Sequence, residues 1–444
     1  MSDHAFAQRP HRTVLLLALP AFFSMVAEPL TGLADTAFIA ALGSEALTAL
    51  GLGATTLSAI FWVFSFLHVT TQTEVARALG AGERERAAEI IATALTTAVL
   101  IGVGLGIAGV LLADWLVVVM GATAEIRELA KSYLAIRFLA APALLMTTVS
   151  AAALRGLQSM RTVMWIATGV NLLNLALDPL LIFGPGPFPA LGVAGAAWAS
   201  VIAQGIGGVL SVVIVLRLVG RRSPRREHLG GLFKVGIDVF LRTGLLSAFL
   251  ALSTRAATLE GELVAAANQV IRQTWLTCAF ALDALGTAGH SLVGYFLGAG
   301  DPRRARQAAA VAITWGVVTG LVFSLVSMLG RELVAVMLVP PEAHAVFFAA
   351  WWVFALGHPV NAVTFVTDGI HFGARDYRWL RNTMVVATAV GWLGLELFVD
   401  GENALVAIWW VTLAWVGVRA GSSMLRIWPG LGRAPLRAEE NPPS

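Results

Sequence analysis

The sequence predicts an all-α integral membrane protein whose twelve transmembrane helices form two six-helix lobes. Three observations lead to this prediction. Only 13% of the residues are charged, whereas soluble domains carry roughly 25%, and the mean hydropathy is +0.78. About twelve apolar stretches reach the roughly 20 residues that a membrane helix needs. The two halves of the chain also resemble each other.

The apolar stretches are expected to be helices, because the alternation of polar and apolar residues that barrel strands require is absent. Helices are then the remaining way to satisfy backbone hydrogen bonds in lipid. The expected spans are 14–40, 50–75, 88–113, 130–153, 162–183, 191–217, 232–256, 264–294, 305–329, 345–370, 381–399 and 403–427.

The halves share landmarks at a spacing of about 217 residues. The sequence "LGAG" occurs at 79–82 and again at 297–300, each time before an arginine-containing run, and Glu45 corresponds to Glu262. Six helices return the chain to its starting side, so both halves enter the membrane in the same orientation. We therefore expect a pseudo-twofold axis along the membrane normal and a cavity between the lobes.

Charge sets the expected topology. Most of the 30 Lys and Arg residues lie in loops on one side, which the positive-inside rule makes cytoplasmic. We expect a multi-pass protein of the cell membrane with both termini in the cytoplasm and no nucleic-acid partner. The expected parts are an N-terminal lobe (1–220), a cytoplasmic linker (221–231), a C-terminal lobe (232–428) and a disordered cytoplasmic tail (429–444).

The expected first-lobe helices carry three polar stripes. Because ionisable side chains in a membrane helix are costly, such residues indicate function. Spacings of three and four place the members of each stripe on one helix face. The stripes consist of Glu28, Thr31 and Asp35; of Asn171, Asn174 and Asp178; and of Ser200 and Gln204.

If the stripes converge, Asp35 and Asp178 form a carboxylate pair in an apolar surround, and such a pair favours the uptake of a proton. Pro20 and Pro29 each remove a hydrogen bond from the first helix. A bend that follows protonation and a static kink are both compatible with these prolines. We single out Pro20 as the expected bend position.

The repeat does not extend to these acids, because Leu252 and Leu395 stand at the positions that correspond to Asp35 and Asp178. In the second lobe, Arg255 and Asp283 are expected to form a buried ion pair of structural character. The chain has one cysteine, Cys278, so a cysteine metal cluster is excluded and no metal site is expected.

Motifs of soluble enzymes are absent: the sequence contains no Walker loop, no HExxH and no nucleophile elbow. We therefore expect no enzymatic activity and no cofactor. Without an ATP-binding loop, uphill transport would have to use an ion gradient, with H⁺ or Na⁺ as the coupling ion.

Several segments, in order, resemble the multidrug and toxic compound extrusion (MATE) family, in particular its DinF-like branch. They are "PLTGLADTAFIAALGSEALTALGLG", "NLLNLALDPLLIFG", "GVAGAAWAS", "LVGYFLGAGDPRRAR" and "FGARDYRWLRN". The resemblance spans nearly the whole chain. It implies a two-lobe antiporter that works by alternating access and exports organic compounds, often cationic, in exchange for an inward cation.

The resemblance assigns cation coupling to Asp35, with Asn174 and Asp178 as its partners, and a bend in the first helix to Pro20. The sodium-coupled NorM-like members carry acids in the second lobe, and Asn361 stands at one such position here. We therefore expect proton coupling in the first lobe. Sodium at the same carboxylates, or a lipid-linked precursor flippase of the same superfamily, remain as alternatives. Membrane lipid and a small organic substrate are the expected partners, and the sequence does not indicate an oligomeric state.

Overall fold

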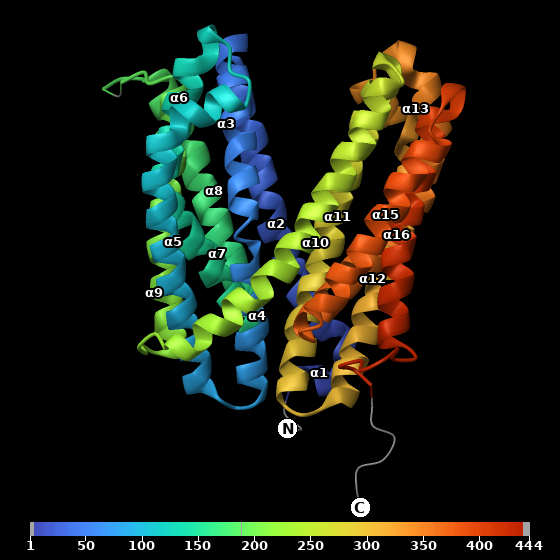
Figure 1. Cartoon of the computed structure of the whole chain (residues 1–444). Helices are drawn as coiled ribbons and strands as arrows, with labels where there is room; N and C mark the ends of the chain where they lie inside the picture. Colours follow the sequence, from blue (N-terminus) through green and yellow to red (C-terminus); the bar gives the residue numbers. More distant parts are fainter. Residues whose placement is uncertain (1–3, 188, 438–444) are drawn as a thin grey trace, which may run out of the picture. The chain divides into compact units, whose positions relative to one another are not determined.

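The structure, a computed structural model, describes residues 4–187 and 189–437; the side chains of Glu28, Leu232, Lys234 and Glu402 lie outside this description. Within these ranges the regular segments are helices and no strand occurs (Figure 1). The all-α prediction is therefore confirmed. The chain divides into two compact units, Phe23–Gly236 and a second unit of Met1–Phe22 with Ile237–Ser444.

The sequence placed the division between the lobes in a linker at 221–231. In the structure α10 already begins at Arg226, and the boundaries between the units fall within α2 and α10. The helices from the first unit onward are α2 (Pro10–Ala40), α3 (Ser44–Trp62), α4 (Ser65–Gly80), α5 (Arg84–Val119), α6 (Ala124–Leu139), α7 (Ala141–Gly156), α8 (Met160–Phe183) and α9 (Val193–Val219).

The second unit is built from the other long helices, preceded by the short α1 (Ala5–Gln8). Its helices α11, α12 and α14 pack against one another, and α16 packs on α14 and α15. The helices are α10 (Arg226–Leu259), α11 (Glu262–Gly298), α12 (Pro302–Leu338), α13 (His344–Leu356), α14 (His358–Gly373), α15 (Tyr377–Phe398) and α16 (Ala404–Ile427).

By length and composition, nine of the described helices could each cross a membrane. Two bent pairs bring the number to eleven: α6 with α7, bent by 51°, and α13 with α14, bent by 49°. The remaining expected span, 381–399, corresponds to α15, which carries Arg378, Arg381 and Glu396. These charged residues near its two ends lower the mean hydropathy of α15, although its central turns are apolar. This explains why α15 is not among the eleven spans.

Both halves break their helices at equivalent positions. The bend between α6 and α7 precedes Pro142, and the bend between α13 and α14 precedes Pro359, 217 residues later. Proline cannot donate a backbone hydrogen bond, so a break at this point is expected. In the second unit the hydroxyl of Ser324 donates to the carbonyl of Ala355, four residues before Pro359, at 2.6 Å.

The turns repeat as well. Gln158 and Arg375, 217 residues apart, are the described non-glycine residues with positive φ, at 61° and 59°. Gly43 and Gly261 precede α3 and α11 with φ of 113° and 108°, in a region that favours glycine. The internal repeat seen in the sequence is thus a repeat of backbone conformation.

The chain after α16 is held by Arg426. Its guanidinium donates to both carboxylate oxygens of Asp376, at 2.7 and 3.2 Å, and to the carbonyls of Leu431 and Arg433. Leu436 is buried. The prediction of a disordered tail is therefore wrong for residues 429–437, because an arginine with several donors binds the chain's own carbonyl groups. Residues 438–444 lie outside the described range.

Asp376 lies in the loop before α15. Burial acts to raise the pKa of Asp376, but hydrogen bonds and charge from His371 and Arg426 outweigh it and hold the pKa below its usual value. We expect Asp376→Asn to lower the free energy of unfolding by about 1.5–3 kcal/mol at pH 7. The carboxylate stabilises the fold above its ordinary pKa, and this contribution is lost as pH falls through the depressed pKa. Thermal unfolding in detergent should show the two proteins converging at acidic pH; a constant difference at all pH values would contradict the assignment.

Close helix packing in the second unit depends on Gly369 in α14. A Cβ at this position would overlap with the backbone carbonyl of Gly286 in α11. We expect Gly369→Ala to destabilise the protein by about 1–3 kcal/mol, because a backbone atom cannot move aside as a side chain can. Gly417→Ala in α16 is the matched control, since nothing lies within 4 Å of its added methyl group. Equal melting temperatures for the two variants would refute the packing argument.

Candidate functional site

The predicted polar residues of the first unit gather beside an apolar cluster at one end of its helices. Ile39 of α2, Tyr133 of α6, Ile182 of α8 and Ala196 of α9 all belong to this cluster and are almost fully buried. We call this cluster the apolar cap. Its side chains exclude water from that end of the unit.

The polar residues lie one helical turn from the cap. Asp35 precedes Ile39 by four residues, and Asp178 likewise precedes Ile182. Short turns connect successive spans, so α6 and α9 run opposite to α2 and α8. The residues four positions after Tyr133 and Ala196, which are Arg137 and Ser200, therefore lie at the same level as the two acids.

Two carboxyl groups meet at this level. Asp35 and Asp178 are close enough for one carboxyl group to donate a hydrogen bond to the other, and both lie in the field of the Arg137 guanidinium. The Asp178 side chain is completely buried. Among the described residues no N–H or O–H group donates to either Asp178 oxygen or to Oδ1 of Asp35. Three of the four carboxylate oxygens of the pair are thus acceptors without a donor among the described protein groups.

Amide and hydroxyl side chains lie at the same level as the two acids. The Asn174 amide donates to the Ser200 hydroxyl at 3.5 Å, and both side chains are buried. Arg137 donates to Oε1 of Gln204 at 3.2 Å, one turn beyond Ser200. We call Asp35, Asp178, Asn174, Ser200, Gln204 and Arg137 the carboxylate cluster.

The other predicted residues lie outside this cluster. Thr31 and Asn171 donate to backbone carbonyls of their own helices, those of Ala27 and Ala167. The side chain of Glu28 lies outside the described part of the chain. Helix α2 continues through Pro20 without interruption, so a bend at this residue stays a prediction.

Arg137 and Tyr133 did not emerge from the sequence, although the signal for Arg137 was present. An arginine inside an expected span, 130–153, is as costly as a buried acid and marks a partner for one. The phenol of Tyr133 lies within hydrogen-bonding reach of Arg137 and in the field of both carboxylates.

A cavity of about 300 Å³ adjoins the cluster within the first unit. Asn171 and Gln204 line one part of it, and Asn171 is partly buried there on the polar face of α8. His68 of α4 and Arg155 of α7 line it further from the cap. The cavity gives the polar face of α8 contact with a polar space inside the unit.

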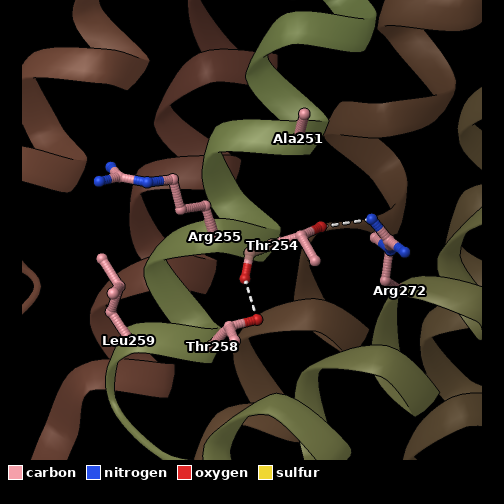
Figure 2. A pocket seen from close by; sticks show the side chains of 6 residues that line it. All are labelled: Ala251, Thr254, Arg255, Thr258, Leu259 and Arg272. Carbon is pink, nitrogen blue, oxygen red and sulfur yellow. Dashed lines mark hydrogen bonds between the residues drawn. The ribbon is translucent and has the colours of Figure 1, made fainter. Parts of the chain in front are cut away.

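The second unit corrects the expectation of a buried pair. Arg255 and Asp283 are both exposed, so they do not form the buried ion pair that the sequence predicted. Arg255 is two residues from the buried Ser253 and Ala257, and a two-residue step turns a helix to its opposite face. Figure 2 shows Arg255 lining a pocket of about 420 Å³, where Thr254 accepts a hydrogen bond from Arg272.

In the second unit the buried Asp368 lies between the buried Arg419 and the partly buried Arg242. One oxygen of Asp368 accepts from both arginines, from Arg419 at 2.7 Å, and Arg419 stacks over the ring of Trp415. This acid therefore has two cationic donors, whereas the two acids of the first unit share one cation. The balance of charge around Asp368 is therefore opposite to that of the carboxylate cluster.

One group of described residues, Glu89, Glu227 and His228, brings three possible metal-ligand atoms within 4.8 Å of one another. Arg225 pairs with Glu89 at 2.9 Å, so an ion-pair network accounts for this group. We assign no metal to it.

Comparison with known proteins places this geometry in a family. The MatE family pattern matches two segments, residues 20–180 and 244–394, which together cover most of the chain and correspond to its two halves. The chain belongs to the MatE family. These are the multidrug and toxic compound extrusion (MATE) transporters, as the sequence resemblance indicated, and the protein is accordingly a multi-pass membrane transporter rather than an enzyme.

Among MATE relatives, the DNA damage-inducible protein F of Escherichia coli is 29% identical over 96% of this chain and 93% of its own length. Protein DETOXIFICATION 44 of Arabidopsis thaliana is 26% identical over 96% and 85%. A crystal structure of MATE in the bent conformation matches with a TM-score of 0.86 at 23% identity, covering 94% of both chains. An outward-facing multidrug resistance MATE transporter matches with a TM-score of 0.85 at 22% identity, covering 95% of this chain and 97% of that one.

The charge balance of the carboxylate cluster can be tested by stability. We expect Arg137→Gln to destabilise the protein at neutral pH by about 1–3 kcal/mol, because the buried Asp178 and the partly buried Asp35 lose the positive charge that favours their ionised forms. Adding Asp178→Asn should recover part of the loss, with a coupling energy of about 0.5–3 kcal/mol. Lys131→Gln, at an exposed ion pair of the same helix, should change stability by less than about 0.5 kcal/mol. Strictly additive melting-temperature shifts would show that Arg137 does not neutralise Asp178.

Proposed function

We propose that this MATE transporter exports organic compounds from the cytoplasm in exchange for inward H⁺, by alternating access, with Asp35 and Asp178 as the proton site. The observation that carries the proposal is the meeting of these two carboxyl groups in a buried place where they lack hydrogen-bond donors. The cell membrane and cytoplasmic termini, which the positive-inside rule predicts, give the exchange its direction.

A proton suits this site for a chemical reason. Two ionised carboxylates are acceptors only, so neither can donate to the other. One proton changes the contact into a charge-assisted O–H···O⁻ hydrogen bond, which is among the strong hydrogen bonds of proteins. A sodium ion would need a shell of oxygen ligands, and the Gln204 oxygen already accepts from Arg137. The Asn174 amide suits either state of the pair, because its N–H groups can donate to an ionised carboxylate and its carbonyl oxygen can accept from a protonated carboxyl group.

Coupling requires that proton and substrate favour different states of the transporter, or exclude each other. A protonated pair removes one buried negative charge and so removes attraction for an organic cation. An ionised pair restores that attraction. This exclusion favours cationic or amphipathic substrates, in agreement with relatives named multidrug resistance protein NorM and with the detoxification proteins.

The energy available is sufficient for export. One positive charge that moves inward through about 100 mV releases about 2.3 kcal/mol. At about 1.4 kcal/mol per tenfold, this supports a substrate gradient of roughly fifty-fold. A neutral substrate would gain this electrical contribution, whereas a monovalent cation exchanged for one proton would gain the pH gradient alone.

We expect Asp35→Asn to abolish efflux driven by a pH gradient, because the remaining carboxylate has lost the partner with which it shares a proton. The measurement is efflux of a fluorescent organic cation from proteoliposomes, with insertion checked by protein recovery. Asp114→Asn serves as the matched control, since Asp114 is half-exposed and paired with Arg127 away from the cluster. Undiminished pH-driven efflux by Asp35→Asn would refute the proton site.

The coupling ion is resolved in the same vesicles. We expect a pH gradient alone to drive efflux, and a sodium gradient at equal pH to drive none. Efflux driven by sodium and lost in Asp35→Asn would keep the site and replace the proton by Na⁺. Efflux driven by sodium that survives Asp35→Asn would place the coupling ion elsewhere.

A further inference from the structure

The carboxylate cluster has an odd balance of charge. Its ionised acids, Asp35 and Asp178, supply two negative charges, and Arg137 supplies one positive charge. Tyr133, the other titratable group of α6 at this level, is neutral in its ordinary protonation state. The cluster residues of α9 are Ser200 and Gln204, which carry no charge. With both acids ionised, the described side chains of the cluster therefore carry a net charge of −1.

Arg137 is fixed in this place rather than free to swing away. Its guanidinium donates to Gln204 at 3.2 Å and lies within reach of the Tyr133 phenol. Tyr133 itself is buried in the apolar cap, and its ring fills the space beside Gly53 of α3. An arginine stays protonated at any physiological pH, so this positive charge is permanent.

A buried site with net charge is costly in a membrane, and neutrality is its cheapest state. One monovalent cation brings the cluster from −1 to zero. A second cation would give the cluster a net charge of +1, which is again a buried charge without a counter-charge. Without Arg137 the same two carboxylates would carry −2, and two cations would be needed for neutrality.

We propose that Arg137 sets the coupling stoichiometry of the transporter at one cation per cycle, by acting as a built-in counter-charge to the carboxylate pair. The inference rests on the proposed cation site at Asp35 and Asp178. In the transport step a proton from water becomes the O–H of one carboxyl group and is donated to the other. The guanidinium keeps its own protons throughout.

The net charge that crosses the membrane in each transport cycle then depends on one side chain, Arg137. Exchange of one proton for one monovalent organic cation moves no net charge. Exchange of two protons for the same substrate moves one positive charge inward, so a membrane potential of about 100 mV would change the steady substrate gradient roughly fifty-fold. The dependence on pH would also steepen, from about tenfold to about a hundredfold per pH unit.

The experiment measures the steady gradient of ethidium in proteoliposomes at a fixed pH gradient, with the potential set by potassium and valinomycin. We expect wild type to respond to pH and not to potential. Arg137→Gln should become sensitive to potential, with the roughly fifty-fold change per 100 mV. Arg137→Lys retains the positive charge and should behave as wild type, and so should the exposed-site control Lys131→Gln.

A second variant guards against a general loss of structure. Arg137→Gln combined with Asp178→Asn returns the net charge of the cluster to −1 but leaves one carboxyl group, so it should recover part of the thermal stability that Arg137→Gln loses without recovering pH-driven efflux. Potential-insensitive transport by Arg137→Gln, or potential-sensitive transport by wild type, would overturn the inference and leave the proton site standing. Absence of any response of wild type to a pH gradient would instead refute the proposed proton coupling. If sodium drives wild type, the same five proteins are compared under a fixed sodium gradient.

Discussion

The site depends on one electrostatic constraint: charges held away from water inside a membrane protein must be balanced by other charges nearby. Asp178 is completely buried, and the positive charge of Arg137 favours its ionised form. The apolar cap next to these groups keeps water out and so strengthens their mutual attraction. Helix geometry brings the polar groups together, because in each of four helices the polar residue lies four positions, or about one turn, from the cap.

The two halves of the repeat meet this constraint in different ways. Their bends and turns match at a spacing of about 217 residues, yet their buried charges differ. In the second unit Asp368 accepts from two arginines and has little need of a further cation. In the first unit two acids share one arginine. A duplicated backbone therefore carries the proposed cation site in one half and an aspartate paired with two arginines in the other.

The sequence predicted those features that follow from periodicity. Apolar stretches located the spans, and spacings of three and four placed Asn174 and Asp178 on one face, where the structure finds both buried. The sequence could not show which face of a helix meets a neighbour. The expectation for Arg255 and Asp283 failed for this reason, because a charged residue in an apolar stretch need not point inward. The pairing of Arg242 and Arg419 with Asp368 joins α10, α14 and α16, and no local pattern encodes contacts at that separation.

The hydrogen bond from Ser324 to the carbonyl of Ala355 stabilises the bend between α13 and α14. A proline in a membrane helix leaves a carbonyl group four residues earlier without its usual donor, and lipid offers no replacement. Here a hydroxyl on the adjacent α12 supplies the donor at 2.6 Å. This hydrogen bond ties the kink at Pro359 to a neighbouring helix, so a change in the bend angle would have to break it.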